Sequence, residues 1–409
     1  MNDNTSNLLW HVGETGAPQQ QGTLGNFRIL IRPNLSVAGW PVNAGSKALD
    51  NYHPYEDAAV VKRIRDQGAR LVGMSRMSEL GFGITGETSH RVLLDKHCNA
   101  FLGTDAAGEI RYLAAMAGAW GFKPSFGICS NLGAIRLIPS MECIGVIADD
   151  PAGIAAIVSI ACEKETGDFS MLWERLPDFS AAGAKKTGSS ANGGDGRIGI
   201  LKEQMDRLDE TDKKAVDQAI SCLRKKGLHI ETVSFPEYAL FQQVHQVVGS
   251  VEASSSAGKY DGVRYGHRVK NADNWNEMYM KTRQEAFGSL IKSYLFQGAF
   301  FQFTDYKAFE HACRLRNLLI KKTAALFEQV DFIASPVRRS KMDAACAKTV
   351  DDVYNAFEHT VPANVIGLPA LTAPGIAETG DTDLGFQLIA PYLSDLKLLN
   401  FAMTYLSAA

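Results

Sequence analysis

The sequence of 409 residues predicts an α/β protein in which helices are layered on a β-sheet. The main observation is a recurring unit, in which an amphipathic helical segment stops near a glycine and leads directly into a short β-rich run. Composition agrees, because 45% hydrophobic and 21% charged residues are typical of a globular protein with a packed core. The length suits one large domain or two smaller ones.

In the first half of the chain, residues 27–31 form a β-rich run that ends before Pro33, which predicts a strand. Residues 57–68 carry apolar side chains at helical spacing and lead into a predicted strand at residues 70–73. A further apolar helix is expected at residues 154–162.

The composition then changes at residues 181–196, which are small and polar and predict a linker loop. In the second half a predicted helix leads into a predicted strand twice more. Asp305 has the residue type and position to cap a long helix that runs to Phe327. Gly227 has the residue type and position to stop a shorter helix at residues 211–226. The predicted elements are a strand at 197–201, a helix at 211–226, a strand at 228–233, a helix from Asp305 to Phe327 and a strand at 331–336.

Charge and cysteine usage limit the possible functions. The formal net charge of −3 gives no reason to expect direct nucleic-acid or membrane-surface binding. No run approaches the roughly 20 apolar residues of a membrane helix, and residues 1–21 do not resemble a secretory signal. The seven scattered cysteines predict reduced core thiols and a cytoplasmic protein. Neither a metal-binding spacing nor a phosphate-binding loop is found, so no cofactor or metal is expected.

Two ordered motifs carry the strongest functional signal. Residues 101–111 read FLGTDAAGEIR, and residues 121–127 read GFKPSFG. They resemble the signature of the amidase signature family, Gly-Ser-Asp-Thr-Gly-Gly-Ser-Ile-Arg followed by Gly-Leu-Lys-Pro-Thr-Tyr-Gly. Further blocks resemble the A subunit of bacterial glutamyl-tRNA(Gln)/aspartyl-tRNA(Asn) amidotransferases within that family. These blocks are residues 251–267, 282–288, 331–336, 360–370 and 384–389.

The resemblance implies the amidase signature fold, with one mixed central β-sheet flanked by helices on both faces. It also gives the expected organisation. Residues 1–26 are expected to be a flexible N-terminal segment and residues 27–409 a single amidase-like domain. Within that domain we expect a signature half at 27–165, a linker loop at 166–196 and a C-terminal half at 197–409.

Members of the family cleave amides with a lysine, a serine on a cis peptide bond and a nucleophilic serine. In this sequence Glu109 stands at the nucleophile position and Arg32 at the lysine position. The glycine-rich loop of the cis-serine is absent, because few residues separate His90 from Phe101. An arginine, with a pKa above about 12, cannot act as the base that such a triad needs. The resemblance therefore predicts that no catalytic residue is intact.

Two further expectations concern this region. Ala106, Ala107 and Gly108 stand in the former oxyanion region, where replacing glycine by alanine is expected to restrict the backbone. Because Arg32 and Glu109 are longer than the residues they replace and carry opposite charges, we expect them to form an ion pair that fills the former site.

Substrate recognition in the A chain of these amidotransferases uses an arginine that matches Arg316. A planar guanidinium suits a carboxylate because it donates two parallel hydrogen bonds. The alternative for Arg316 is a solvated helix residue. His267 replaces a tyrosine of the family pattern and is the second candidate for substrate binding. Only 31 residues precede Arg32, fewer than in relatives, where this region helps to seat partner subunits.

Three functions are therefore considered. The leading one is a degenerate, A-subunit-like paralogue of the amidotransferases that lacks amidase and glutaminase activity and acts as a scaffold or regulator. Its partners would be amidotransferase-type subunits or a second copy of itself. The second is an active amide-hydrolysing enzyme, either the glutaminase component of a tRNA-dependent amidotransferase or an amidase with a rebuilt site. The third is a decaying gene product without a selected role.

Overall fold

A computed structural model describes residues 7–13, 22–172, 176–179, 182, 196–376, 378–379 and 382–407. The centre of the molecule is a single mixed sheet of eleven strands. Across the sheet the strands are β1 (Leu9–His11), β3 (Arg70–Ser75), β2 (Arg28–Ile31), β4 (Ala100–Asp105), β6 (Cys143–Ala148), β5 (Trp120–Lys123), β10 (Ala370–Ala373), β13 (Phe386–Ile389), β9 (Phe332–Pro336), β7 (Arg197–Leu201) and β8 (His229–Val233).

Parallel and antiparallel pairs alternate in blocks along this sheet. β2 lies parallel to β3 and β4, and β7 lies parallel to β8 and β9. The strands between these two blocks pair antiparallel. A short ribbon of β11 (Glu378–Thr379) and β12 (Thr382–Asp383) lies outside the main sheet. The mixed sheet expected from the family resemblance is confirmed.

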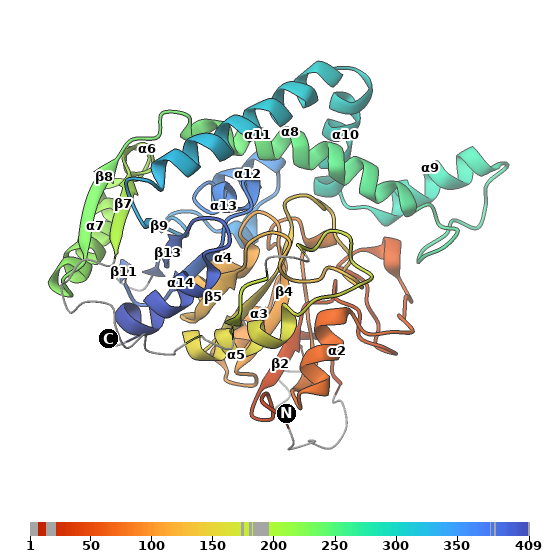
Figure 1. Cartoon of the computed structure of the whole chain (residues 1–409). Coiled ribbons are helices and arrows are strands. Elements are labelled where there is room, and N and C mark those ends of the chain that lie inside the picture. Colours follow the sequence, from red (N-terminus) through yellow and green to blue (C-terminus); the bar gives the residue numbers. More distant parts are fainter. Residues whose placement is uncertain are drawn as a thin grey trace.

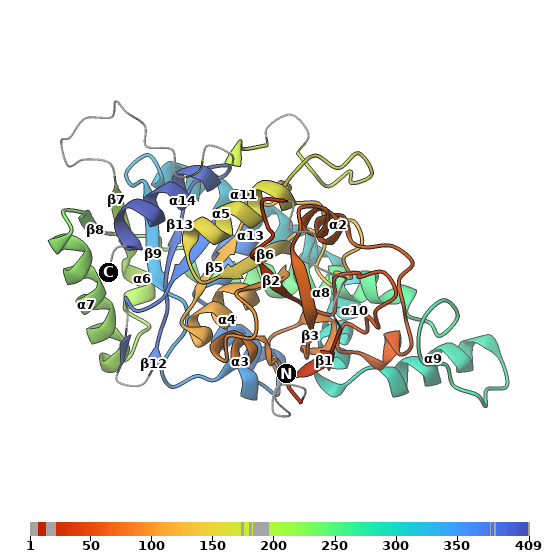
Figure 2. The ribbon, with the colours of Figure 1, turned by 90° about the horizontal axis from the view of Figure 1, so that it is seen from below.

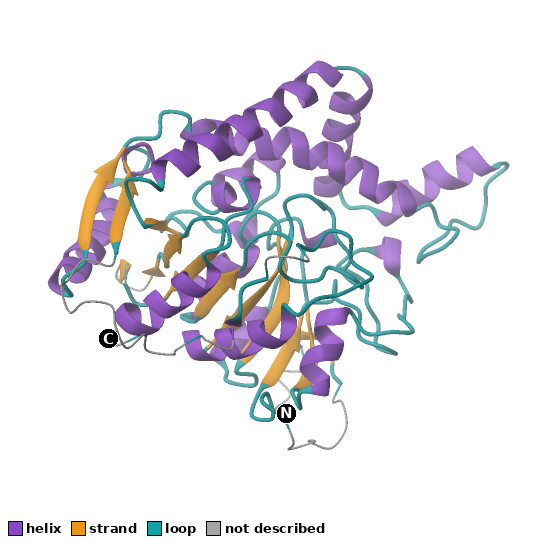
Figure 3. Ribbon diagram, viewed as in Figure 1, coloured by secondary structure: helices purple, strands orange, loops and turns teal. Residues whose placement is uncertain are grey.

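Helices cover both faces of the sheet, as Figures 1 and 2 show. One face carries α2 (Ala59–Asp66), α5 (Pro151–Ala161), α7 (Glu210–Lys225) and α14 (Asp395–Phe401), whose apolar residues share one buried cluster. The other face carries α3 (Ser89–Leu94), α4 (Glu109–Ala117), α8 (Tyr238–Ser256), α10 (Ser289–Phe303), α11 (Tyr306–Leu326), α12 (Val350–Ala356) and α13 (Val361–Val365). The short α6 (Lys202–Met205) follows β7, and α9 (Trp275–Ala286) extends away from the body (Figure 3).

The helix–glycine–strand units predicted from the sequence are present. Gly227, with φ of +84°, follows the last turn of α7 and leads into β8. Asp305 caps α11 as expected, because its side chain accepts a hydrogen bond from the N–H of Ala308. Most of the predicted linker at residues 181–196 lies outside the described residues. Inside the N-terminal segment, Leu9–His11 forms the edge strand β1 on β3.

The cysteines depart from expectation. Cys129 and Cys162 form a disulfide, so the prediction of seven reduced thiols is wrong for this pair. Their Cα atoms lie 4.2 Å apart although 33 residues separate them, because the loop after β5 packs on the end of α5. The other five cysteines are free. None of the helices within the described ranges is long and apolar enough to cross a bilayer.

Candidate functional site

The two residues at the positions of the family's lysine and nucleophile are brought to one edge of the sheet. Arg32 directly follows β2, and Glu109 begins α4, shortly after the end of β4. β2 and β4 are parallel neighbours, so their C-terminal ends lie side by side. The side chains of Arg32 and Glu109 are both 0% exposed.

The carboxylate of Glu109 is held by the backbone that precedes α4. Its Oε2 accepts hydrogen bonds from the N–H groups of Ala106 at 2.8 Å, Ala107 at 2.9 Å and Gly108 at 3.2 Å. Three converging N–H groups at a helix N-terminus form an anion-binding nest. We expected Ala106 and Ala107 to restrict the backbone so that its N–H groups could not converge, and this restriction is not observed. Of these three residues only Gly108 has a positive φ, of 130°, and it is still glycine.

Gly108 is required by its neighbour across the site as well as by its backbone angle. A Cβ atom at this position would lie 2.0 Å from Oγ1 of Thr360. Thr360 Oγ1 in turn donates a hydrogen bond of 2.6 Å to the carbonyl oxygen of Ala107. The turn between β4 and α4 is thus fixed from outside by the start of α13.

The predicted ion pair between Arg32 and Glu109 is wrong. Within the described part of the chain, Arg32 pairs with Glu87 instead: Nε and Nη2 each lie 3.1 Å from Glu87 Oε2. Arg32 Nη1 donates a further bond of 3.0 Å to the carbonyl oxygen of Thr104. The expectation failed because Glu109 turns back onto its own helix N-terminus, where the nest already satisfies one carboxylate oxygen. Oε1 of Glu109 has no hydrogen-bond partner among the described residues.

Glu87 was not identified from the sequence. It lies in a Thr-Gly-Glu-Thr stretch before α3, a composition that is typical of an exposed turn. In the fold Glu87 is only 5% exposed, and its Oε1 accepts a bond of 3.1 Å from Ser75 Oγ at the end of β3. No local pattern could reveal this, because the partner is 55 residues away along the chain.

Burial and charge determine the ionisation of Glu109. Burial raises the pKa of Glu109 to about 7, and the nearby carboxylate of Asp105 contributes to that rise, while Arg32 and the N–H groups act in the opposite direction. Burial by itself would also raise the pKa of Asp105. The guanidinium of Arg111 outweighs that effect and lowers the pKa of Asp105 below its usual value.

Asp105 and Arg111 form a second buried ion pair that supports the signature turn. Nε and Nη2 of Arg111 lie 3.1 and 2.9 Å from the two carboxylate oxygens of Asp105, a bidentate contact. Arg111 Nη1 also binds the carbonyl oxygen of Thr360 and Oε1 of Gln387. Asn364 Nδ2 completes the cluster on Asp105 Oδ1 at 2.9 Å. This part of the signature therefore ties β4 and α4 to α13 and β13.

A cluster of ring side chains lies beside the nest. Tyr294 Oη, Tyr354 Oη and His245 Nδ1 are joined by two hydrogen bonds of 2.9 Å, and His245 Nε2 lies 2.9 Å from the carbonyl oxygen of Ala106. A carbonyl can only accept, so His245 carries its proton on Nε2 and accepts from Tyr354 at Nδ1. Burial lowers the pKa of His245 to about 4, so the ring is neutral. Phe82 stacks on Tyr294 at 4.2 Å.

Arg316, the first substrate-binding candidate, is largely occupied by the protein. Its Nε donates to the carbonyl oxygen of Val365 at 2.6 Å, and its Nη1 and Nη2 bind the side chain and carbonyl of Ser140, both at 2.8 Å. It lies at the wall of a cavity of about 590 Å³. The remaining lining residues are Phe126, Ser140, Ile320, Thr323, Ala324, Phe327, Ile366, Gly367, Leu368, Pro391 and Tyr392.

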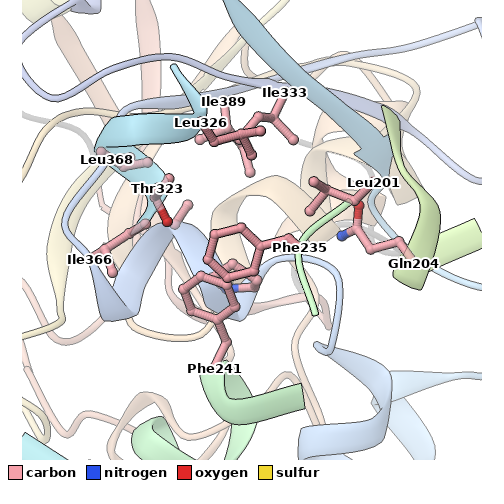
Figure 4. Close-up of a pocket in the computed structure, with 12 residues that line it drawn as sticks. Leu201, Gln204, Phe235, Phe241, Thr323, Leu326, Ile333, Ile366, Leu368 and Ile389 are labelled. Carbon is pink, nitrogen blue, oxygen red and sulfur yellow. The ribbon is translucent and has the colours of Figure 1, made fainter. Parts of the chain in front are cut away.

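His267, the second candidate, is not among the residues that line this cavity. Its Nε2 lies 2.6 Å from Glu285 Oε2 on α9. A smaller void of about 20 Å³ adjoins the first cavity and shares Thr323, Ile366 and Leu368 with it. Figure 4 shows its mainly apolar lining. A void of this size has room for about one water-sized group, which is too little for a substrate. Among the described residues, no cluster of three or more His, Cys, Asp or Glu side chains could hold a metal ion.

The fold and the signature turn define a class of protein. The sequence profile of the family described as "Amidase" matches residues 11–92 and 96–399, so the chain belongs to the amidase family. It is similar to the A subunit of glutamyl-tRNA(Gln) amidotransferase from Archaeoglobus fulgidus, at 30% identity over 407 residues that cover 93% of this chain and 86% of the relative. The corresponding protein from Natronomonas pharaonis is 30% identical over 414 residues, which cover 94% of this chain and 96% of the relative.

Solved structures give the same fold. The A subunit of glutamyl-tRNA(Gln) amidotransferase from Thermotoga maritima superposes with a TM-score of 0.76 at 20% identity, covering 96% of this chain and 86% of that one. The 6-aminohexanoate cyclic dimer hydrolase superposes with a TM-score of 0.72 at 19% identity, covering 93% and 84%. The molecule therefore has the amidase signature fold.

Proposed function

We propose that this chain is an amidase-family protein without amide-hydrolysing activity, which acts as a scaffold or regulatory relative of the A subunit of the amidotransferases. One observation carries the proposal. The three N–H groups of residues 106–108, the donors nearest to the signature's nucleophile position, are all bound to the chain's own Glu109 carboxylate.

Amide cleavage needs free donors for the developing oxyanion, a nucleophile and a base that activates it. The side chain of Glu109, which stands in place of the nucleophile, accepts hydrogen bonds from the three N–H groups that would otherwise be free donors. Arg32 replaces the amine with a permanent cation, whose donors are bound to Glu87 and Thr104. Each requirement of the family's reaction is therefore blocked by one of these two residues, which supports a loss of the triad rather than an altered one.

The alternative is an active enzyme with a rebuilt site. It would require a cleft through which an amide could reach Glu109. The complete burial of Glu109 and Arg32 and the stacked rings of Phe82 and Tyr294 argue against such a cleft. No contact among the described residues of this region favours the alternative over the first proposal.

The names of the similar proteins support a binding role for this chain. The similar proteins are subunits of an amidotransferase, so their fold works in association with other chains. A chain that keeps this fold with a closed site could still present the outer surface that such subunits recognise. The expected partners are therefore amidotransferase-type subunits or a second copy.

The test is ammonia release from glutamine and asparagine by the purified full chain, alone and with the other subunits of an amidotransferase. A parallel reaction contains hydroxylamine, which would release any acyl group from the chain as a free hydroxamate, and the chain from the reaction without hydroxylamine is weighed by mass spectrometry. We expect neither ammonia nor an acyl adduct on the chain above the level of a blank without protein, and the exposed substitution Glu163→Ala is the matched control for Glu109→Ala. Turnover that Glu109→Ala abolishes but Glu163→Ala leaves unchanged would overturn the proposal. An acyl adduct detected on the chain by mass spectrometry would have the same consequence.

A further inference from the structure

The cavity beside Arg316 is a mainly apolar space that reaches from the surface into the protein. Its volume of about 590 Å³ lies within the range of about 300–1,000 Å³ that is usual for small-molecule sites. Its lining includes Ile320 and Tyr392, which are each 44% exposed, together with Thr323 and Leu368, which are buried. A small molecule can therefore enter from the exposed side and bury its apolar surface against the inner wall.

A water-sized void adjoins the buried side of this cavity. The void of about 20 Å³ shares Thr323, Ile366 and Leu368 with the cavity, and Gln204 of α6 also lines it. Figure 4 shows Thr323 and Gln204 on two sides of the void. Thr323 is 4% exposed and Gln204 2%, yet Thr323 Oγ1 and Gln204 Oε1 have no hydrogen-bond partner in the part of the chain that the structure describes. Because unpaired buried polar atoms are costly, a ligand group that pairs with them gains affinity.

The hydrogen bonds around Gln204 determine which kind of group it can bind. Tyr238 Oη donates its proton to the carbonyl oxygen of Glu358 at 2.8 Å, since a carbonyl can only accept. Tyr238 Oη therefore accepts from Gln204 Nε2, which lies 2.8 Å away. This contact directs the amide nitrogen of Gln204 to Tyr238 and leaves Oε1 as the unpaired atom. The void therefore offers an acceptor, and the matching ligand group is a donor.

Charge restricts the ligand to a neutral molecule. Among the lining residues that the structure describes, Arg316 is the only charged one. It disfavours a cationic amine, which would also lose its hydration without a counter-ion. Arg316 does not need an anionic ligand, because its guanidinium already donates to Ser140 and Val365. Burial lowers the pKa of Arg316, and the nearby carboxylate of Glu252 opposes that effect, so the charge of Arg316 is partly balanced within the protein.

We propose that the cavity and the void together bind a neutral apolar alcohol, with the apolar body in the cavity and the hydroxyl group in the void. The hydroxyl group matches the void in size, since it is about as large as a water molecule. It donates to Gln204 Oε1 and accepts from Thr323 Oγ1. A carboxylate or a primary amide is larger than this space. The inference goes beyond the scaffold function, because it gives the chain a small-molecule site away from Glu109.

The test is isothermal titration calorimetry of the full chain with cinnamyl alcohol and two probes of the same carbon skeleton. Cinnamyl methyl ether has no donor, and cinnamate carries a carboxylate. We expect a dissociation constant below about 1 mM for the alcohol and at least about 5-fold weaker binding of both other probes, which leave Gln204 Oε1 unpaired. Gln204→Leu and Thr323→Val should each weaken binding of the alcohol by about 3–10-fold, and Gln204→Leu should remove its advantage over the ether.

A second pair of variants keeps the test decisive if Gln204→Leu does not fold. Ala324→Phe places a ring in the cavity from α11 and should weaken binding of the alcohol by at least about 10-fold. Ala325→Phe is the matched control, because Ala325 is the next residue of the same helix, is also exposed, and does not line the cavity. It should bind the alcohol as the native chain does. Circular dichroism checks that each variant is folded.

Three results would overturn the proposal. The first is no binding of cinnamyl alcohol up to about 5 mM, or binding that Ala324→Phe and Ala325→Phe weaken equally. The second is equal affinity for the alcohol and the ether, which would mean that no ligand hydroxyl enters the void. The third is tighter binding of cinnamate than of the alcohol, lost in Arg316→Met, which would make the cavity a carboxylate site. None of these results depends on ammonia release, so they leave the proposed function to its own test.

Discussion

Arg32 and Glu87 form a buried ion pair in which Glu87 Oε2 lies 3.1 Å from both Nε and Nη2 of Arg32. The pair joins the end of β2 to the segment before α3. The arginine that stands in place of a catalytic base thus has a structural partner that lies elsewhere in the fold. Its charge is compensated without Glu109.

The first prediction concerns this pair. Arg32→Met and Glu87→Gln should each lower the free energy of unfolding by about 3–5 kcal/mol, because each leaves a buried charge without its partner. The double variant Arg32→Met/Glu87→Gln should be less destabilised than the sum of the single changes. Urea denaturation gives all three values. The exposed pair Lys62–Asp66 is the control, since Lys62→Met should cost less than about 1 kcal/mol. Additive single changes at Arg32 and Glu87 would contradict the coupling.

The second prediction is a pH dependence from Glu109. Its folded-state pKa is raised to about 7, so in the folded chain Glu109 stays protonated at pH values where it is already ionised in the unfolded chain. A raised carboxyl pKa costs nothing below the unfolded pKa, near 4.5, where both states are protonated. The cost grows as the pH rises to about 7 and is constant above that.

Glu109→Gln removes this ionisation and keeps an oxygen that can accept the three N–H groups. The variant should therefore gain stability relative to the native chain between about pH 4.5 and pH 8, by on the order of 1–3 kcal/mol. Urea unfolding of both proteins across this range measures the difference. A difference that does not change with pH would show that Glu109 does not titrate in this window.

The third prediction compares the two ends of α4. Gly108→Ala places a Cβ 2.0 Å from Thr360 Oγ1 at a φ of +130°, so it should destabilise the fold by on the order of 2–5 kcal/mol. Gly118→Ala is the control. It also has a positive φ, of +57°, but its Cβ would meet nothing within 4 Å, so about 1 kcal/mol is expected. Thermal melts of both variants make the comparison. Equal losses would mean that the approach of Thr360 does not matter.

The fourth prediction concerns the link between Cys129 and Cys162. The chain purified without reductant and then denatured should titrate five thiols, and after reduction all seven. Because the disulfide joins residues 33 positions apart, Cys129→Ala/Cys162→Ala should lower the free energy of unfolding by about 3–4 kcal/mol. The control is Cys222→Ala, at an exposed free cysteine. Seven thiols before reduction would contradict the disulfide.

The sequence by itself determined the elements and the family. The cap at Asp305, the stop at Gly227 and the apolar periodicities are short-range signals, so they locate α7, β8 and α11 without the tertiary structure. The signature at residues 101–111 placed Glu109 at the nucleophile position, and together with the other blocks it predicted the mixed sheet that is observed.

Only the tertiary structure decided which groups meet in the site. Glu87 reaches Arg32 from 55 residues away, and Cys129 reaches Cys162 from 33 residues away. Glu109 turns to the N–H groups at the start of its own helix rather than to the arginine across the site. A carboxylate binds where several donors converge, and that convergence is set by how β4, α4 and α13 pack together rather than by the order of residues along the chain.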